Sequence, residues 1–185
     1  MLDNLYKDAE QRMSKAVEAA RNEFAAVRTG RASPALLDRL HVESYGQEMA
    51  LKSMAQISTP DGRTLLITAW DKSTVPAIRK AIETSDLGLT PNVDGQNIRL
   101  SIPALTEERR KDLVKLIKKK GEEGKVAVRN VRHKVVDEIK HLLKDHKITE
   151  DENKRANEHV QKLTDKFIHE VDQLLAHKEK EIMEV

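Results

Sequence analysis

The stretch LTEERRKDLVKLIKKKGEEGKVAVRNVRHKVVDEIKHLLKDH, residues 105–146, decides the fold because it predicts one long helix. Thr106 is a suitable N-cap, and Glu107 and Glu108 follow in the first turn, where the helix dipole favours acids. Roughly 40 residues at 1.5 Å each make a rod of about 60 Å, longer than a compact domain of this mass is wide. Apolar residues at helical spacing predict a packed face, formed by Leu113, Ile117, Val128, Val131, Val135 and Leu142.

Cations recur along the same helix at intervals of seven residues. Residues 107–147 hold 14 Lys and Arg against 8 Asp and Glu, while residues 148–185 hold 6 against 10. A local basic ridge on a chain of net charge +2 suits an anionic surface such as a nucleic-acid backbone. The ridge consists of Lys111, Lys118, Lys125 and Arg132, with Arg129 one turn back on the same side.

The alternative interpretation of this ridge is a solvated helix face whose cations pair with acids one turn away, as Lys125 could with Glu122. Arg129 and Arg132 favour RNA binding, because they are three residues apart and arginine offers a planar fork of donors that matches phosphate oxygens. No aromatic residue lies on the ridge. Since readers of unpaired bases use aromatic platforms, we expect structured RNA, recognised by its shape and backbone.

Two further helices are predicted, one on each side of the ridge helix in sequence. Apolar residues recur at three and four from about Leu5 to Arg28, with Thr29 and Gly30 at the expected end. A capping box, Thr149 to Glu152, opens the last helix. Its spine has nearly heptad spacing, so three long helices should pack side by side: Val160, Leu163, Phe167, Val171, Leu174 and Ile182.

Residues 31–104 change character and predict a small β/α domain inserted into the bundle. Strands are expected at 40–45, 65–70 and 97–102, with a turn at 59–62 and a short helix ending at Thr84. The predicted architecture is therefore α+β, with residues 1–30 and 105–185 forming a three-helix bundle. Two short connections would form a hinge, and they comprise Thr29, Gly30 and Arg31 on entry and Ile102, Pro103, Ala104 and Leu105 on exit.

The sequence offers no constellation for catalysis or for a bound metal or cofactor. There is no cysteine, no Gly-rich phosphate loop and no nucleophile elbow. The seven histidines include pairs eight residues apart, such as His133 and His141, which is too far to share an ion without other ligands. Because no catalytic constellation is found, we expect a non-enzymatic protein. Because the N-terminus lacks an apolar run, we also expect it to be cytoplasmic and to have no membrane span.

Four segments, in order along the chain, resemble the bacterial ribosome recycling factors. They are TGRASP at 29–34, SDLG at 85–88, LTEERRKDL at 105–113 and VAVRNVR at 126–132. The resemblance covers the whole chain, including the place of the inserted domain. Gly121 and Gly124 depart from it, because a helix former is expected at these two positions and each glycine costs about 1 kcal/mol relative to alanine. The helix is expected to be softer there.

The resemblance implies a two-armed, L-shaped monomer, similar in outline to transfer RNA, that lacks catalytic activity and needs no cofactor. It implies binding to the post-termination ribosome, mainly through large-subunit rRNA, and subunit splitting with elongation factor G and its GTP hydrolysis. Arginines 110, 129 and 132 would then lie on the RNA-facing side, and Arg28 and Arg31 near the elbow. The expected RNA-binding set is Arg28, Arg31, Arg110, Lys118, Lys125, Arg129 and Arg132.

A helical interaction protein, such as a chaperone-like adaptor with charged rods, is the alternative from another functional class. Retention on ribosomes that vanishes with moderate salt would favour RNA binding. Binding to an apolar partner that is insensitive to salt would favour the adaptor.

Overall fold

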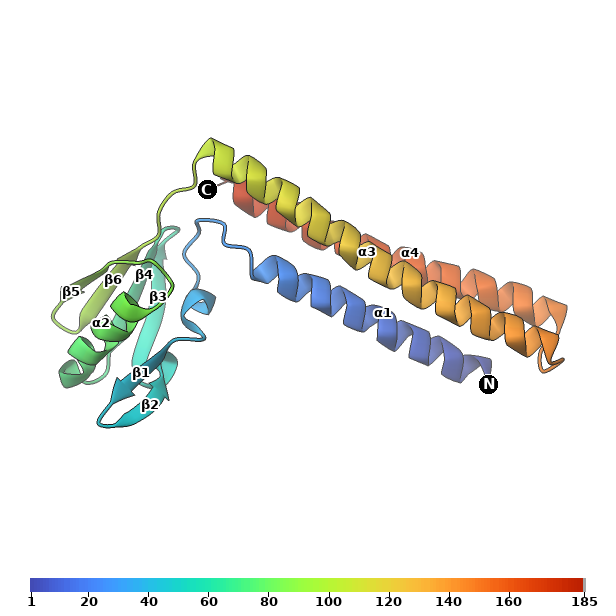
Figure 1. The fold of residues 1–185 in the computed structure, drawn as a ribbon, viewed down its shortest axis with the longest axis horizontal. Coiled ribbons are helices and arrows are strands. Elements are labelled where there is room, and N and C mark those ends of the chain that lie inside the picture. Colours follow the sequence, from blue (N-terminus) through green and yellow to red (C-terminus); the bar gives the residue numbers. More distant parts are fainter. Residues whose placement is uncertain (185) are drawn as a thin grey trace. The chain divides into compact units, whose positions relative to one another are not determined.

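The computed structural model describes residues 1–184 and divides them into two compact units. Unit 1 comprises Met1–Arg28 and Glu107–Glu184, and unit 2 comprises residues 29–106. Unit 1 contains the three long helices, α1 (Leu2–Ala25), α3 (Glu107–Lys144) and α4 (Glu150–Glu184), which pack side by side (Figure 1). None of the described helices is both long enough and apolar enough to cross a membrane.

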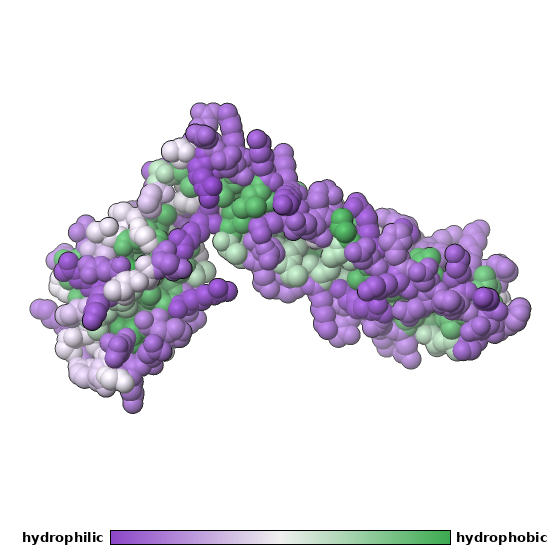
Figure 2. All heavy atoms as spheres, in the orientation of Figure 1, coloured by the Kyte–Doolittle hydropathy of each residue, from purple (hydrophilic) through white to green (hydrophobic). Residues whose placement is uncertain are grey.

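The three helices of unit 1 enclose a thin aliphatic core, as their periodicity predicts. In α3, Leu113, Ile117, Val128 and Val135 are buried, and from α4 the buried Val160, Phe167, Val171 and Ile182 face inward. Hydrophilic residues cover most of the helical unit on the face shown in Figure 2, with smaller apolar areas between them. Burial of one face of each helix, rather than helix propensity, is the main source of stability in such a bundle. Members from α1 are Ala9, Met13, Val17, Ala20 and Phe24.

Helix α4 begins with the predicted capping box. The backbone N–H of Glu152 donates to Oγ1 of Thr149 at 3.2 Å, and the backbone N–H of Thr149 donates to Oε2 of Glu152 at 2.7 Å. This reciprocal pair satisfies two backbone donors that a helix start would otherwise leave unpaired. Helix α1, by contrast, ends at Ala25, earlier than the predicted Arg28. Gly30 has a φ of +75° but lies beyond the helix, so it shapes the connection and does not cap the helix.

Unit 2 contains a four-stranded antiparallel sheet, a two-stranded hairpin and helix α2 (Val75–Thr84). The sheet has the order β3-β4-β6-β5, and β1 pairs with β2. Val75, Ile78 and Ile82 of α2 are buried with Leu65, Ile67, Ile98 and Leu100 of the sheet. The strands are β1 (His41–Ser44), β2 (Gln47–Ala50), β3 (Ala55–Asp61), β4 (Thr64–Ala69), β5 (Pro91–Asp94) and β6 (Asn97–Ser101).

Two sequence predictions for unit 2 were wrong in detail. The expected turn at 59–62 begins later, because residues 59–61 belong to β3 and only Gly62 and Arg63 form the turn. Pro60 is tolerated there because β3 is an edge strand with an irregular register between Ser58 and Asp61. Strands β2, β3 and β5 were not predicted, whereas β1, β4 and β6 correspond to the three expected strands within one or two residues.

Candidate nucleic-acid interface

The lysines of the predicted ridge on α3 are engaged within the protein. Nζ of Lys125 lies 2.5 Å from Oδ1 of Asp172 on α4 and 3.3 Å from Oε1 of Glu122, and its side chain is only 15% exposed. The hydrogen bond to Asp172, with a smaller contribution from Glu122, raises the pKa of the Lys125 ammonium. Lys125 therefore stabilises the seam between α3 and α4, and its charge is largely compensated.

Two other ridge lysines are also paired, although more loosely. Lys118 lies 3.9 Å from Glu179 on α4, and Lys111 lies 3.6 Å from Glu107 one turn back on α3. Both side chains are well exposed, so each pair is worth only tenths of a kcal/mol. For these lysines the structure matches the alternative interpretation, in which a charged helix face pairs with neighbouring acids.

The arginines of the ridge differ from the lysines. Arg129 is exposed and Arg132 partly buried, and neither forms an ion pair or a side-chain hydrogen bond with any residue that the structure describes. One helical turn separates them, so the two guanidinium groups lie on adjacent turns of α3. Val126, which is 48% exposed, lies three residues before Arg129 and adds an apolar contact area to the same side. This arrangement can bind two neighbouring phosphates.

Arg110 lies in the first turn of α3, about 28 Å from Arg129 along the helix at 1.5 Å per residue. Its side chain is partly buried, and its Nε is fully buried without a hydrogen-bond partner among the described residues. A buried guanidinium N–H without a partner carries a free-energy cost, so the Nε of Arg110 differs from the guanidinium groups of Arg129 and Arg132, which have no such buried atom within residues 1–184.

The other predicted site residues lie in the two connections between the units. Arg28 is the last residue of the first segment of unit 1, and Arg31 belongs to unit 2; both are exposed. Gly30 lies against the exit connection, because a Cβ on Gly30 would lie 3.0 Å from Cγ of Leu105 and 3.5 Å from the carbonyl oxygen of Pro103. The entry and exit segments are therefore in contact, and glycine at position 30 permits this close approach.

Both connections are fastened to the same turn of unit 2. The backbone N–H of Ala32 donates to the Gly62 carbonyl at 2.8 Å, and that of Ile102 donates to the Arg63 carbonyl at 2.8 Å. The carboxylate of Asp61 accepts a hydrogen bond from the Arg63 backbone N–H at 2.8 Å, which holds its pKa below the usual value. Of the predicted hinge residues, Ile102 is consequently anchored to the β3–β4 turn.

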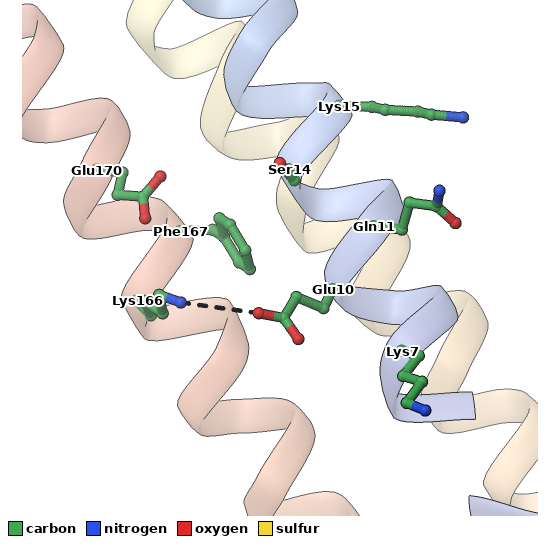
Figure 3. Close-up of a pocket in the computed structure, with 8 residues that line it drawn as sticks. All are labelled: Lys7, Glu10, Gln11, Ser14, Lys15, Lys166, Phe167 and Glu170. Atoms are coloured by element: carbon green, nitrogen blue, oxygen red, sulfur yellow. Dashed lines mark ion pairs between the residues drawn. The ribbon is translucent and has the colours of Figure 1, made fainter. Parts of the chain in front are cut away.

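Unit 1 also has a groove of about 560 Å³ between α1 and α4, to which α3 contributes no residue (Figure 3). Lys166 lies 3.8 Å from Glu10 across the groove, and its Nζ lies 5.2 Å from the centre of the Phe167 ring. The residues that line the groove carry both positive and negative charges, and they do not form a set of hydrogen-bond donors directed at one point. The groove therefore lacks the single-sign surface that the arginines of α3 provide.

The packing role of Gly121 and Gly124 was not predicted from the sequence. A Cβ at Gly124 would lie 3.0 Å from Cβ of Ala20, and one at Gly121 would lie 3.1 Å from Cδ2 of Leu175. Both glycines are buried, and α3 continues through them. Small residues allow helices to approach closely, but the sequence does not show that another helix lies against them, so it held no signal for this packing. They allow α1 and α4 to pack closely against the part of α3 that precedes the arginine pair.

Comparisons with known proteins show which family this chain resembles. A family model described as ribosome recycling factor matches residues 20–183. The ribosome-recycling factor of Symbiobacterium thermophilum is 57% identical over 185 residues, and that of Halalkalibacterium halodurans is 55% identical over 185 residues; each match covers the whole of both chains. The match to the ribosome-recycling factor of Thermosynechococcus vestitus has 56% identity and covers 96% of this chain and 98% of the relative.

Solved structures show the same similarity. A solution structure of ribosome recycling factor shares 48% identity and a TM-score of 0.79, and the match covers 100% of this chain and 98% of that one. A second structure describes models for the T. thermophilus ribosome recycling factor and the E. coli elongation factor G bound to the E. coli post-termination complex. It shares 47% identity and a TM-score of 0.67, with 98% of each chain covered. The chain therefore belongs to the ribosome recycling factor family.

Proposed function

We propose that this protein binds the post-termination ribosome in the cytoplasm and, together with elongation factor G and GTP hydrolysis, separates the subunits and frees the mRNA. Support comes from the family and from a relative described with elongation factor G on a post-termination complex. The protein itself catalyses no covalent step and acts as a monomer. Hydrolysis of GTP belongs to its partner.

The observation that carries the RNA-binding part is that Arg129 and Arg132 have no ion-pair partner within residues 1–184, beside lysines that are paired. An arginine already engaged with a carboxylate must break that pair before it can bind phosphate, whereas these two bind without such a loss. Large-subunit rRNA is the partner that fits, because a rigid helix carrying spaced guanidinium groups can follow a structured backbone. Arg110 would contribute a third contact at the start of the same helix.

The connections between the units would carry force in this mechanism. Elongation factor G would push on unit 2 while unit 1 is held on rRNA, and rotation about the connections would disrupt contacts between the subunits. Because Ala32 and Ile102 are fastened to the β3–β4 turn, we place the pivot on the helix side of these residues, near Gly30 and at residues 103–105. The proposed hinge is therefore narrower than the predicted one, because it leaves out Ile102, which is hydrogen-bonded to the β3–β4 turn.

A salt titration of ribosome binding tests the RNA contact. Arg129→Ala/Arg132→Ala should bind 70S ribosomes more weakly, and its slope of log affinity against log salt should fall by about 2, roughly 1 for each lost phosphate contact. The matched control is Lys7→Ala/Lys15→Ala, which removes two exposed charges from the α1 side of the groove in the same unit. An unchanged slope in the arginine variant, or an equal fall in the control, would remove the arginine pair from the interface.

A further inference from the structure

Unit 2 exposes two of the five aromatic residues of the chain. Tyr45 is 83% exposed and Trp70 is 64% exposed, whereas Phe24 and Phe167 of unit 1 are at most 5% exposed. In a chain so poor in aromatics, their large rings would be expected in the core. Exposed Trp and Tyr residues are typical of contact sites with other molecules.

The two aromatic residues belong to one end of unit 2. Tyr45 forms the turn between β1 and β2, and its hydroxyl lies 2.9 Å from Oγ of Ser73, three residues after Trp70. The backbone N–H of Trp70 donates to the carbonyl of Met54, the residue that follows the 3₁₀ turn after β2. The Tyr45 ring is thus held at its tip while its faces stay open to solvent. We call Tyr45 and Trp70 the aromatic patch.

The hairpin that carries Tyr45 also carries two exposed carboxylates. Glu43 of β1 lies directly opposite Glu48 of β2; both are exposed, and neither forms an ion pair with another described residue. Like charges directly opposite on neighbouring strands are unfavourable, so the hairpin retains a destabilising pair that a cation would relieve. Next to Trp70, the charges of Asp71 and Lys72 balance.

We propose that the aromatic patch, with Glu43 and Glu48 beside it, docks an arginine- or lysine-bearing segment of a partner protein. A guanidinium or ammonium group can lie over the open ring faces while the two carboxylates pair with neighbouring cations. The same carboxylates repel phosphates, which disfavours single-stranded RNA stacked on the rings. This inference rests on the proposed function, in which a protein partner acts on unit 2, and deepens it by naming the residues of unit 2 that such a partner would contact and the charge that it would carry.

The fluorescence of Trp70, the only tryptophan in the chain, provides a local readout in the full-length protein. An octa-arginine peptide and an oligouridylate serve as probes at moderate salt. Glu43→Gln/Glu48→Gln removes the carboxylates, and Tyr45→Asn removes one ring while keeping a residue that tolerates the positive φ of +52°. The matched control is Asp86→Asn/Asp94→Asn, which changes the charge of unit 2 equally at two exposed acids.

Octa-arginine should change the Trp70 emission of the wild type and of the Asp86/Asp94 control with the same affinity. Binding should weaken about tenfold in Glu43→Gln/Glu48→Gln and about threefold in Tyr45→Asn. Equal affinity in the two charge variants would overturn the proposal, and so would a stronger response to oligouridylate than to octa-arginine.

Photocrosslinking on ribosomes gives an independent test. With p-benzoylphenylalanine in place of Tyr45, the full-length protein on 70S ribosomes should form adducts that proteinase removes and ribonuclease leaves intact. Adducts to rRNA would contradict the assignment of a protein partner. Since Arg129 and Arg132 remain unchanged in this variant, ribosome binding itself is measured separately, and a failure of the patch is distinguishable from a failure of the proposed function.

Discussion

At the scale of single residues, Gly121 and Gly124 set how closely the helices of unit 1 approach. Both positions are buried in α3, Gly124 facing Ala20 of α1 and Gly121 facing Leu175 of α4 and Phe24 of α1. The two neighbours differ in mobility. The Cβ of Ala20 is fixed to its backbone, whereas Cδ2 of Leu175 is the end of a flexible side chain. The same substitution should therefore have different effects at the two glycines.

Gly124→Ala should lower the free energy of unfolding by about 1–2 kcal/mol. The added methyl would lie 3.0 Å from the fixed Cβ of Ala20, and the cost of overpacking exceeds the gain of roughly 1 kcal/mol in helix propensity. Gly121→Ala should be neutral or stabilising by up to about 1 kcal/mol, because Leu175 can turn aside. Urea unfolding of both variants against the wild type measures the difference, and the reverse order would contradict this packing.

The close approach at the glycines could not be read from the sequence. A single chain shows that glycine lowers helix propensity, which predicts softness, but does not show that another helix lies within contact. Lys125 is a similar case, because its partner Asp172 lies on α4, far away in sequence. Spacing and chemistry singled out Arg129 and Arg132 in the sequence, and their binding of RNA stays a prediction. The pairing of Lys118 and Lys125 with acids of α4 could not be predicted, because those partners are distant in sequence.

At the scale of elements, the capping box at the start of α4 was predictable because its two hydrogen bonds are local in sequence. Thr149→Ala should lower the free energy of unfolding by about 1 kcal/mol, since the backbone N–H of Glu152 would lose its acceptor. Thr90→Ala, at an exposed position outside helices and strands, is the control and should have almost no effect. Chemical denaturation at neutral pH measures both, and equal values would show that the box contributes nothing.

The helices and strands differ in how well they could be predicted. The long helices repeat their apolar pattern over many turns, so α3 was predicted within about two residues of its observed ends. Strands β2 and β5 have only four residues each and are mostly exposed, which leaves little alternation to detect. Strand β3 contains Pro60 and Asp61, which favour turns in most contexts. Its position at the edge of the sheet permits them.

At the scale of the whole molecule, the proposed mechanism requires that unit 2 transmit force to unit 1. Insertion of Gly-Ser-Gly both between Arg28 and Thr29 and between Thr106 and Glu107 would lengthen both connections at the boundary between the units. The inserted variant should bind ribosomes with nearly unchanged affinity, because the arginines of α3 are intact, and should lose most of its splitting activity. Normal splitting by this variant would show that the short connections are not needed. The L shape implied by the resemblance stays a prediction.

The central claim is that unpaired arginines on α3 hold the protein on the ribosome while a partner drives the subunits apart. The most direct test follows light scattering of post-termination ribosomes mixed with elongation factor G, GTP and either the wild type, Arg129→Ala/Arg132→Ala or Lys7→Ala/Lys15→Ala. We predict rapid splitting that requires both factors with the wild type and the lysine control, and at least tenfold slower splitting with the arginine variant at subsaturating protein. Splitting at the wild-type rate by the arginine variant would contradict the account.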